Sequence, residues 1–308
     1  MLALSVPWII LLLVIETIFF FYKKKRILAS LFFIIALLLN WCCECIPYRL
    51  SYKSGYYGED VLKVICFNID GSTGNLQEKA RNVRNFLRDY SPDIVFIAEY
   101  DDIHPNIMDS LLRDDFEYST YYSNAMFFQY FYGNVPLINS RRLKDKDGED
   151  VGVYTCATML KGDTIDLFGC HFVSNNYSAN HSRFSPDSIE NASGLLSYLK
   201  NIEVAGQRRI VEANTLIQEK AASSHHAILM GDLNDVCGSK PLKILESYGF
   251  KDAWWEGGVG YGATISYPLP YRIDHIMYTK GLTLEKIRVI DSNGLSDHDA
   301  LYAEFSIH

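Results

Sequence analysis

Two long apolar runs in the first 43 residues constrain this chain more than any other feature of its sequence. Val6 to Tyr22 contains one acidic residue, Glu16, and Ile27 to Cys43 contains no charged residue. Each run approaches the roughly 20 residues that an α-helix needs to span the hydrocarbon core of a bilayer. Four consecutive basic residues, 23–26, separate the runs. The sequence therefore predicts a transmembrane helical hairpin over residues 1–48, with spans of about 6–22 and 27–43.

The basic residues between the two runs also predict the orientation of the hairpin. Short loops rich in Lys and Arg remain on the cytoplasmic side of a membrane. Both ends of the hairpin, and everything that follows it, would then lie outside the cytoplasm, in a periplasmic or extracellular space. A cleaved signal peptide is the alternative, but its positive charges would precede the apolar run, whereas here they follow it.

The remainder of the chain is long enough for one large acidic domain. We expect a linker over residues 49–60 and a catalytic domain over residues 61–308. The whole chain has a formal charge of −8, and its first 50 residues carry five basic and two acidic side chains, which leaves −11 for the rest. Such a domain has no general attraction for nucleic-acid phosphates or anionic lipids. A bound cation can still reverse the local field at a site.

Apolar and aromatic runs recur through the predicted domain and indicate that strands dominate it. The strand-like runs are residues 61–67, 93–98, 121–132, 151–160, 164–172, 227–230, 273–279, 284–290 and 300–307. Helical spacing predicts helices over 76–90, over 188–222 as two helices separated near Gly206, and over 242–248. These helices are too few and too irregular for a βαβ repeat. The pattern favours an α/β (α+β) fold, a four-layered sandwich of two packed mixed β-sheets flanked by helices.

Polar residues recur where these apolar strands begin or end. They are Asn68, Glu99, His171, Asp232, Asn234, Asp297 and His298. Carboxylate and amide oxygens suit Mg²⁺ or Mn²⁺, and histidine beside such an ion suits acid–base work or stabilisation of phosphoryl charge. Any one of these residues could instead form a turn, and His171 could be a core histidine. Together they indicate metal-assisted hydrolysis of a phosphate ester.

Six short motifs then resemble the endonuclease/exonuclease/phosphatase superfamily, which includes pancreatic-type deoxyribonucleases, abasic-site endonucleases, neutral sphingomyelinases and inositol polyphosphate phosphatases. The resemblance covers residues 61–308. In chain order the motifs are Cys66-Phe67-Asn68-Ile69-Asp70-Gly71, Asp93 to Glu99, Phe168-Gly169-Cys170-His171-Phe172, Gly231-Asp232-Leu233-Asn234, Arg272-Ile273-Asp274-His275-Ile276 and Ser296-Asp297-His298. Three of them, the Gly-Asp-Leu-Asn, Arg-Ile-Asp and terminal Ser-Asp-His motifs, are highly specific in that order.

The resemblance implies a metal site that binds Mg²⁺ or Mn²⁺. Glu99 would be the main ligand, aided by Asn68 and Asp297, with Asp70 as a weaker or water-bridged ligand. A divalent cation bound there would be the cofactor of the reaction.

The resemblance also implies roles for the remaining residues, in an in-line attack of water on phosphorus without a covalent intermediate. Asp232 would orient or deprotonate the water, and Asn234 would hold the phosphate and the Asp232 side chain. His298, oriented by Asp274, would act on the phosphoryl group or the water. His171 would donate to a non-bridging phosphate oxygen.

The substrate stays open at the level of sequence. A nucleic acid and a lipid headgroup are both compatible phosphate esters, and no obligate protein partner is expected. Two aromatic segments, Met126–Gly133 and Trp254-Trp255, could contact a base or an acyl chain, or could belong to the core and its edge. A membrane-tethered binding module that has lost catalysis is the alternative function, and a missing Glu99 or His298 would have been its signature.

Cysteine usage is less informative. Cys42, Cys43 and Cys45 crowd the end of the second apolar run, where a disulfide is conceivable in an oxidising compartment but cannot be assigned from the spacing. Cys66, Cys156 and Cys170 lie in apolar strand-like runs and are expected to be core residues.

Overall fold

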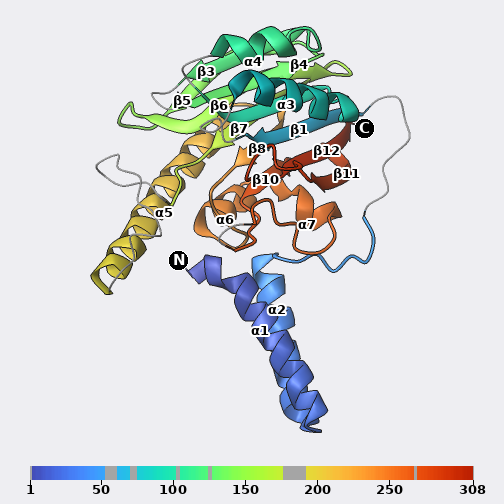
Figure 1. The fold of residues 1–308 in the computed structure, drawn as a ribbon, viewed down its shortest axis with the longest axis vertical. Helices are drawn as coiled ribbons and strands as arrows, with labels where there is room; N and C mark the ends of the chain where they lie inside the picture. The colour runs from blue at the N-terminus through green and yellow to red at the C-terminus, as the bar shows by residue number, and fades with distance from the viewer. Residues whose placement is uncertain are drawn as a thin grey trace.

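The computed structural model describes residues 2–52, 61–69, 75–101, 105–123, 127–175, 192–266 and 269–307. It contains a helical hairpin followed by a domain built from two six-stranded sheets. Figure 1 shows the hairpin projecting from the domain on the side of helices α6 and α7.

The hairpin consists of α1 (Leu2–Tyr22) and α2 (Arg26–Cys43). Both helices are long and apolar enough to cross a membrane. The second helix ends where Glu44 adopts a left-handed conformation and its backbone N–H donates to the carbonyl of Asn40. The side-chain amide of Asn40 then forms hydrogen bonds with both the N–H and the C=O of Ile46. This buried amide fixes the direction in which the chain leaves α2.

The two sheets are mixed, because each has one parallel pair of strands among antiparallel neighbours: β1 with β2, and β7 with β8. The first sheet has the order β11-β12-β1-β2-β4-β3 and the second β5-β6-β7-β8-β10-β9. The strands are β1 (Leu62–Asn68), β2 (Ile94–Asp101), β3 (Tyr118–Ser123), β4 (Phe127–Gly133), β5 (Ile138–Lys144), β6 (Asp150–Leu160), β7 (Asp163–His171), β8 (His226–Asp232), β9 (Lys251–Asp252), β10 (Asp274–Tyr278), β11 (Leu282–Ile290) and β12 (Ala300–Ile307).

Helices cover the outer faces of the two sheets (Figure 1). They are α3 (Leu76–Tyr90), α4 (Pro105–Leu112), α5 (Ala192–Ala221) and α6 (Lys240–Ser247), whereas the short helix α7 (Ala253–Gly257) contributes Ala253 and Trp254 to the cluster between the sheets. Apolar residues of α3 and α4 form one core cluster with the first sheet, and residues of α5 and α6 form another with the second. A third cluster fills the space between the sheets. The predicted four-layered sandwich is therefore confirmed.

Helix α3 illustrates how the sequence specifies these layers. The Asn75 side chain caps its first turn by accepting hydrogen bonds from the N–H groups of Gln77 and Glu78. Val83 and Leu87 recur at helical spacing and are buried against the sheet. The helix ends at Ser91, which adopts a left-handed conformation immediately before a proline.

Several sequence predictions about individual elements were wrong. Helix α5 runs without interruption through Gly206, because a single glycine costs a helix only about 1 kcal/mol and packing compensates for it. The aromatic run 121–132 is divided between β3 and β4. Helices α4 and α7 and strand β5 were not predicted, since α4 and α7 are short and β5 is mostly exposed. The predicted strand over residues 300–307, in contrast, is confirmed by β12, and Asp297 and His298 lie just before it.

The structure assigns the buried residues of the two aromatic segments to the core. Tyr130, Phe131 and Tyr132 are buried in β4 and belong to the core. Trp254 is buried against the backbone of Gly258 and Gly262, whereas its neighbour Trp255 is partly exposed. Cys66, Cys156 and Cys170 are buried, as expected.

Close contact between the two sheets at Gly169 gives a testable consequence for stability. A Cβ atom at this position in β7 would lie 2.1 Å from the ring of Phe96 in β2. We expect Gly169→Ala to destabilise the domain by about 1–3 kcal/mol, because the ring must shift within a packed core. Gly206→Ala is the control: its Cβ would meet only Arg209 Nη2, at 3.9 Å, so the substitution should be neutral or stabilising. Thermal unfolding measures both variants, and an unchanged Tm for Gly169→Ala would contradict the packing described.

Candidate active site

Strand register alone brings three of the predicted site residues together in the second sheet. His171 at the end of β7 lies opposite Asp232 at the end of β8, and Asp232 lies opposite Asp274 at the start of β10. In the first sheet, Asn68 ends β1 beside Ala98, the neighbour of Glu99. Side chains of both sheets thus meet at one rim of the sandwich.

Asn68 connects the two sheets at this rim. Its amide nitrogen donates to Glu99 Oε1 at 2.9 Å and to Asp232 Oδ2 at 3.1 Å. Glu99 occupies a bulge of β2, where the register against β4 shifts and its backbone has φ of 59°. A left-handed conformation is unusual for glutamate and is found where surrounding structure enforces it. The bulge directs this carboxylate toward the rim rather than along the regular alternation of the strand.

Glu99 also forms an ion pair with His171, whose Nε2 lies 2.7 Å from Glu99 Oε1. Burial alone would raise the pKa of Glu99, but the charge of His171 and the hydrogen bonds from His171 and Asn68 lower it to about 2. Burial alone would lower the pKa of His171, but the Glu99 carboxylate raises it to about 9. The carboxylate and the imidazolium therefore stabilise each other's charged forms at neutral pH.

Asp232 is held by the backbone and side chain of Asn234. The Asn234 N–H donates to Asp232 Oδ1 at 2.7 Å, and its amide nitrogen donates to Asp232 Oδ2 at 3.2 Å and to the carbonyl of Phe172 at 2.8 Å. Asn234 has φ of 49° and Gly231 has φ of 137°, so the strand end turns sharply on both sides of the carboxylate. Burial and the charge of Asp274 raise the pKa of Asp232 to about 7.

His298 and Asp274 form a buried pair on the other side of Asp232. His298 Nδ1 lies 2.8 Å from Asp274 Oδ2, and His298 Nε2 lies 4.0 Å from Asp232 Oδ2. Burial alone would lower the pKa of His298, but Asp274 raises it well above its usual range. The aspartate fixes the imidazole so that Nε2 is directed toward Asp232.

The structure does not bring the two remaining predicted metal ligands, Asp297 and Asp70, into the described group of converging side chains. Asp297 is exposed, and its Oδ1 lies 3.3 Å from the Ser296 hydroxyl oxygen. It lies next to His298 in sequence, but the two clusters of converging ligand atoms in the described chain do not include it. Asp70 lies outside the described residues.

The donor set fits a divalent cation. Side-chain atoms of Glu99, His171 and Asp232 all lie within 4.8 Å of one another, and so do those of Asp232, Asp274 and His298; the carboxylate oxygens in these two groups are the atoms suited to a cation. Asn68 uses its amide nitrogen for both of its hydrogen bonds to carboxylates, so its amide oxygen is the atom suited to a cation. Carboxylate and amide oxygens of this kind are common ligands of divalent cations in proteins.

Two residues that support the site were missed by the sequence analysis. The Ser296 hydroxyl donates to the carbonyl of Asn68 at 2.7 Å and accepts from the N–H of His298 at 3.1 Å, so it joins β1 to the histidine. The Thr264 hydroxyl accepts from the N–H of Asp274 at 3.2 Å. Ser296 stands in a quoted motif and could have been found there, whereas the loop that contains Thr264 carries no sequence signal.

Comparisons with known proteins agree with this geometry. Residues 65–298 match the sequence profile of the Endonuclease/Exonuclease/phosphatase family. A search of curated protein sequences found no match.

Solved structures share the fold at low sequence identity. A humanized TDP2 from D. rerio has a TM-score of 0.59 and 18% identity, covering 80% of this chain and 99% of that one. The human Nocturnin catalytic domain with a bound sulfate anion has a TM-score of 0.59 and 16% identity, covering 80% of this chain and 95% of that one. A family protein from Bacteroides vulgatus has a TM-score of 0.59 and 16% identity, covering 81% and 100%. The profile match covers most of the chain, and the chain therefore belongs to the endonuclease/exonuclease/phosphatase family of metal-dependent hydrolases.

Proposed function

We propose that this protein is a membrane-anchored, divalent-metal-dependent phosphoesterase whose active site is the rim cluster. We define the rim cluster as Asn68, Glu99, His171, Asp232, Asn234, Asp274 and His298. The observation that carries the proposal is the convergence of these residues, from six strand ends or adjoining loops of two sheets, around one small volume. Family membership makes hydrolysis of an ester bond the expected chemistry.

The residues of the rim cluster are arranged for an in-line attack of water on phosphorus. A divalent cation held by Glu99 and Asn68 would supply a Lewis acid that neutralises phosphate charge. Asp232, held by Asn234, is placed to orient the attacking water and accept its proton. His298 is directed toward the same volume by Asp274 and can donate to a phosphoryl oxygen.

The rate should depend on pH through Asp232, which accepts a proton only when ionised. Its raised pKa of about 7 predicts that kcat/KM falls as the pH drops below that value, and a bound cation moves this limb to lower pH. Asp274→Asn removes a neighbouring negative charge that raises this pKa, so the acid limb should shift to lower pH while kcat falls. pH–rate profiles of the wild type and of Asp274→Asn measure the shift of the acid limb. An acid limb that moves to higher pH in the variant would contradict the role of Asp232 as the proton acceptor.

Contacts between the hairpin and the domain favour a substrate at the membrane surface. Trp8 Nε1 donates to the Tyr271 hydroxyl at 3.1 Å, and Tyr48 packs on Trp255 with ring centroids 5.7 Å apart. Ile265 forms backbone bridges with both Tyr271 and His298, so the first apolar helix contacts a residue close to the site. With the hairpin in a bilayer, the rim cluster would lie near the headgroups, and a lipid phosphate ester is the substrate class we favour.

Nucleic acid is the second candidate, because a D. rerio TDP2 of this fold has been solved with a single-stranded DNA product. The test compares the full chain in vesicles on sphingomyelin, phosphoinositides, and single- and double-stranded DNA, with bis-nitrophenyl phosphate as a generic diester. Faster turnover of a lipid than of either DNA supports a lipid phosphate ester as the substrate. Faster turnover of DNA would instead identify the protein as a nuclease. Metal binding without turnover of any ester would favour the inactive binding module.

The proposed topology places the domain outside the cytoplasm, since the basic turn between α1 and α2 would remain inside. Protease added to intact cells or spheroplasts should then cleave the domain. Full protection in sealed cells would overturn this orientation without affecting the proposed chemistry.

A further inference from the structure

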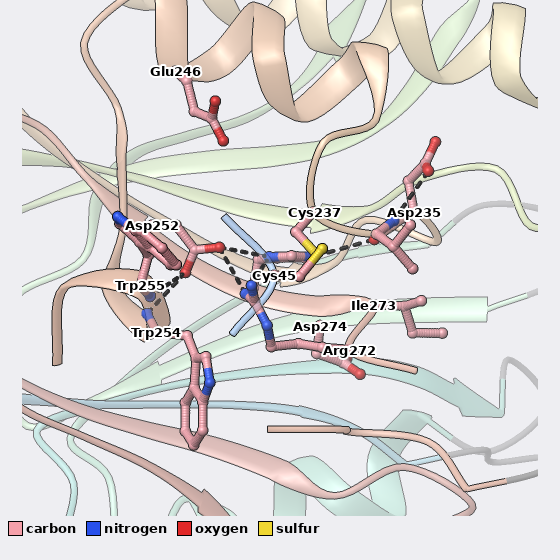
Figure 2. Close-up of polar contacts among 12 residues, drawn as sticks. Cys45, Asp235, Cys237, Glu246, Asp252, Trp254, Trp255, Arg272, Ile273 and Asp274 are labelled. Atoms are coloured by element: carbon pink, nitrogen blue, oxygen red, sulfur yellow. Dashed lines mark hydrogen bonds and ion pairs between the residues drawn. The ribbon is translucent and has the colours of Figure 1, made fainter. Parts of the chain in front are cut away.

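Two cysteines from distant parts of the chain meet where the hairpin joins the domain. Cys45 follows the end of α2, and Cys237 lies in the loop between β8 and α6. Their sulfur atoms are 2.6 Å apart, although the residues are separated by 192 positions in sequence. Both side chains are buried, with 0% and 2% of their surface exposed. Figure 2 shows the two side chains in contact, with Arg272 beside them.

The chain on both sides of this contact is held in place. Cys45 lies in the turn that the Asn40 side chain fixes through Ile46. Val6 and Ile10 of α1 pack around the two sulfur atoms in a small apolar cluster. These contacts keep the two cysteines facing each other.

Gly238 allows the end of α2 to approach the loop. It has φ of 77°, and a Cβ at this position would lie 2.9 Å from the Cβ of Cys43. Only glycine combines this conformation with so close an approach. The loop after β8 is therefore shaped to receive the end of the second apolar helix.

A buried cation lies near Cys237. Arg272 is 1% exposed and pairs with Asp252 through Nη1 at 2.6 Å. The hydrogen bond with Cys45, and to a smaller extent the Arg272 guanidinium, lower the pKa of Cys237 against the opposing effect of burial. The thiolate is the nucleophile of thiol–disulfide exchange, and the positive charge of Arg272 favours the thiolate form of Cys237.

We propose that Cys45 and Cys237 form a disulfide that ties the membrane anchor to the loop after the catalytic residues of β8. Before the hairpin docks on the domain and buries the two thiols, the Cys237 thiolate would attack a protein disulfide of a thiol–disulfide oxidoreductase, and one thiolate of that protein would leave. Cys45, after losing its proton, would then attack the Cys237 sulfur of the mixed disulfide and release the second thiolate. Two thiols of this chain are oxidised, one disulfide of the donor is reduced, and the two protons pass to the donor's thiolates. The step requires the extracytoplasmic orientation proposed above.

The tie would act close to the chemistry. Cys237 follows Asp232 and Asn234 by a few residues, and between them Asp235 is held by Arg209 Nε at 2.9 Å and by His275 Nε2 on its carbonyl at 3.1 Å. The loop that carries Cys237 is thus held to the rest of the domain through Asp235. A disulfide at Cys237 would also hold this loop, and with it the rim cluster, to the membrane anchor. This position distinguishes the pair from a bond that only stabilises the linker.

A cleavable linker tests the proposal in the full chain. A protease site is inserted within residues 53–60, thiols are blocked with N-ethylmaleimide during membrane isolation, and the cleaved protein is run on a gel with and without reductant. We expect the hairpin fragment to stay attached to the domain without reductant and to separate with it. Cys45→Ser and Cys237→Ser should each release the fragment without reductant, whereas Cys42→Ser, at an exposed cysteine, should retain it.

Separation of the wild-type fragments without reductant would overturn the proposal. Retention in Cys45→Ser would also overturn it, because another cysteine would then be the partner of Cys237. Treating the membranes with diamide adds one distinction. Cross-linking only after diamide would keep the contact but reject a native disulfide, and no cross-linking even then would reject the contact itself.

Discussion

His298→Ala is expected to lower kcat by about 10³-fold, the middle of the range for loss of a positioned acid–base group, with little change in KM. The imidazole is buried, held by Asp274 at 2.8 Å, and directed at Asp232, which is an arrangement for acting on a reacting group. Steady-state kinetics on bis-nitrophenyl phosphate measures the loss. Retention of more than about a tenth of wild-type kcat would exclude His298 from the chemistry.

Two controls separate this loss from misfolding. His225→Ala removes an imidazole that pairs with Asp166 on the surface, so its activity should match the wild type. Circular dichroism and metal titration of His298→Ala should remain close to the wild type, because His298 is not among the proposed ligands. A variant that loses both metal binding and its folded spectrum would give no support to the assigned role.

Glu99→Gln is expected to weaken metal binding by roughly 10–100-fold or more. Losing a residue that only supports a metal ligand already weakens binding by about this much, and Glu99 is a proposed ligand itself. The substitution removes the charge that would attract the cation and leaves a neutral amide in the bulge of β2. It also removes the partner that raises the pKa of His171 to about 9, so the imidazole should titrate at lower pH.

Calorimetric titration with Mg²⁺ and Mn²⁺ measures the affinity, and NMR of the histidine resonances measures the pKa of His171. Glu219→Gln is the matched control, since that carboxylate pairs with Arg141 on the surface. Unchanged metal affinity in Glu99→Gln would show that Glu99 is not a ligand and that the cation is held by the other acidic groups of the rim cluster.

The sheets could be predicted from the sequence because buried strands carry an unmistakable apolar pattern. The clustering of His171, Asp232 and Asp274 follows from strand ends that share a rim once the strands pair in register. The recurrence of polar residues at those ends therefore predicted which side chains lie together at the rim. Their individual roles stay proposals.

Other features depend on geometry that no local pattern encodes. The left-handed backbone of Glu99 arises from a register shift between β2 and β4, which only the folded sheet defines. Gly206 was interpreted as a helix boundary because local propensity suggests one, and the packing of α5 on the second sheet overrides it. The approach of Cys45 to Cys237 depends on how the hairpin docks, which spacing within residues 42–45 could not reveal.

The most direct test of the account is metal-dependent turnover by the full chain in vesicles. After treatment with EDTA the protein should hydrolyse no phosphate ester. Addition of Mg²⁺ or Mn²⁺ should restore hydrolysis in the wild type. The same metal concentration should not restore it in His298→Ala or in Glu99→Gln. Turnover that survives EDTA, or that is equal in the wild type and both variants, would contradict a metal-dependent phosphoesterase centred on the rim cluster.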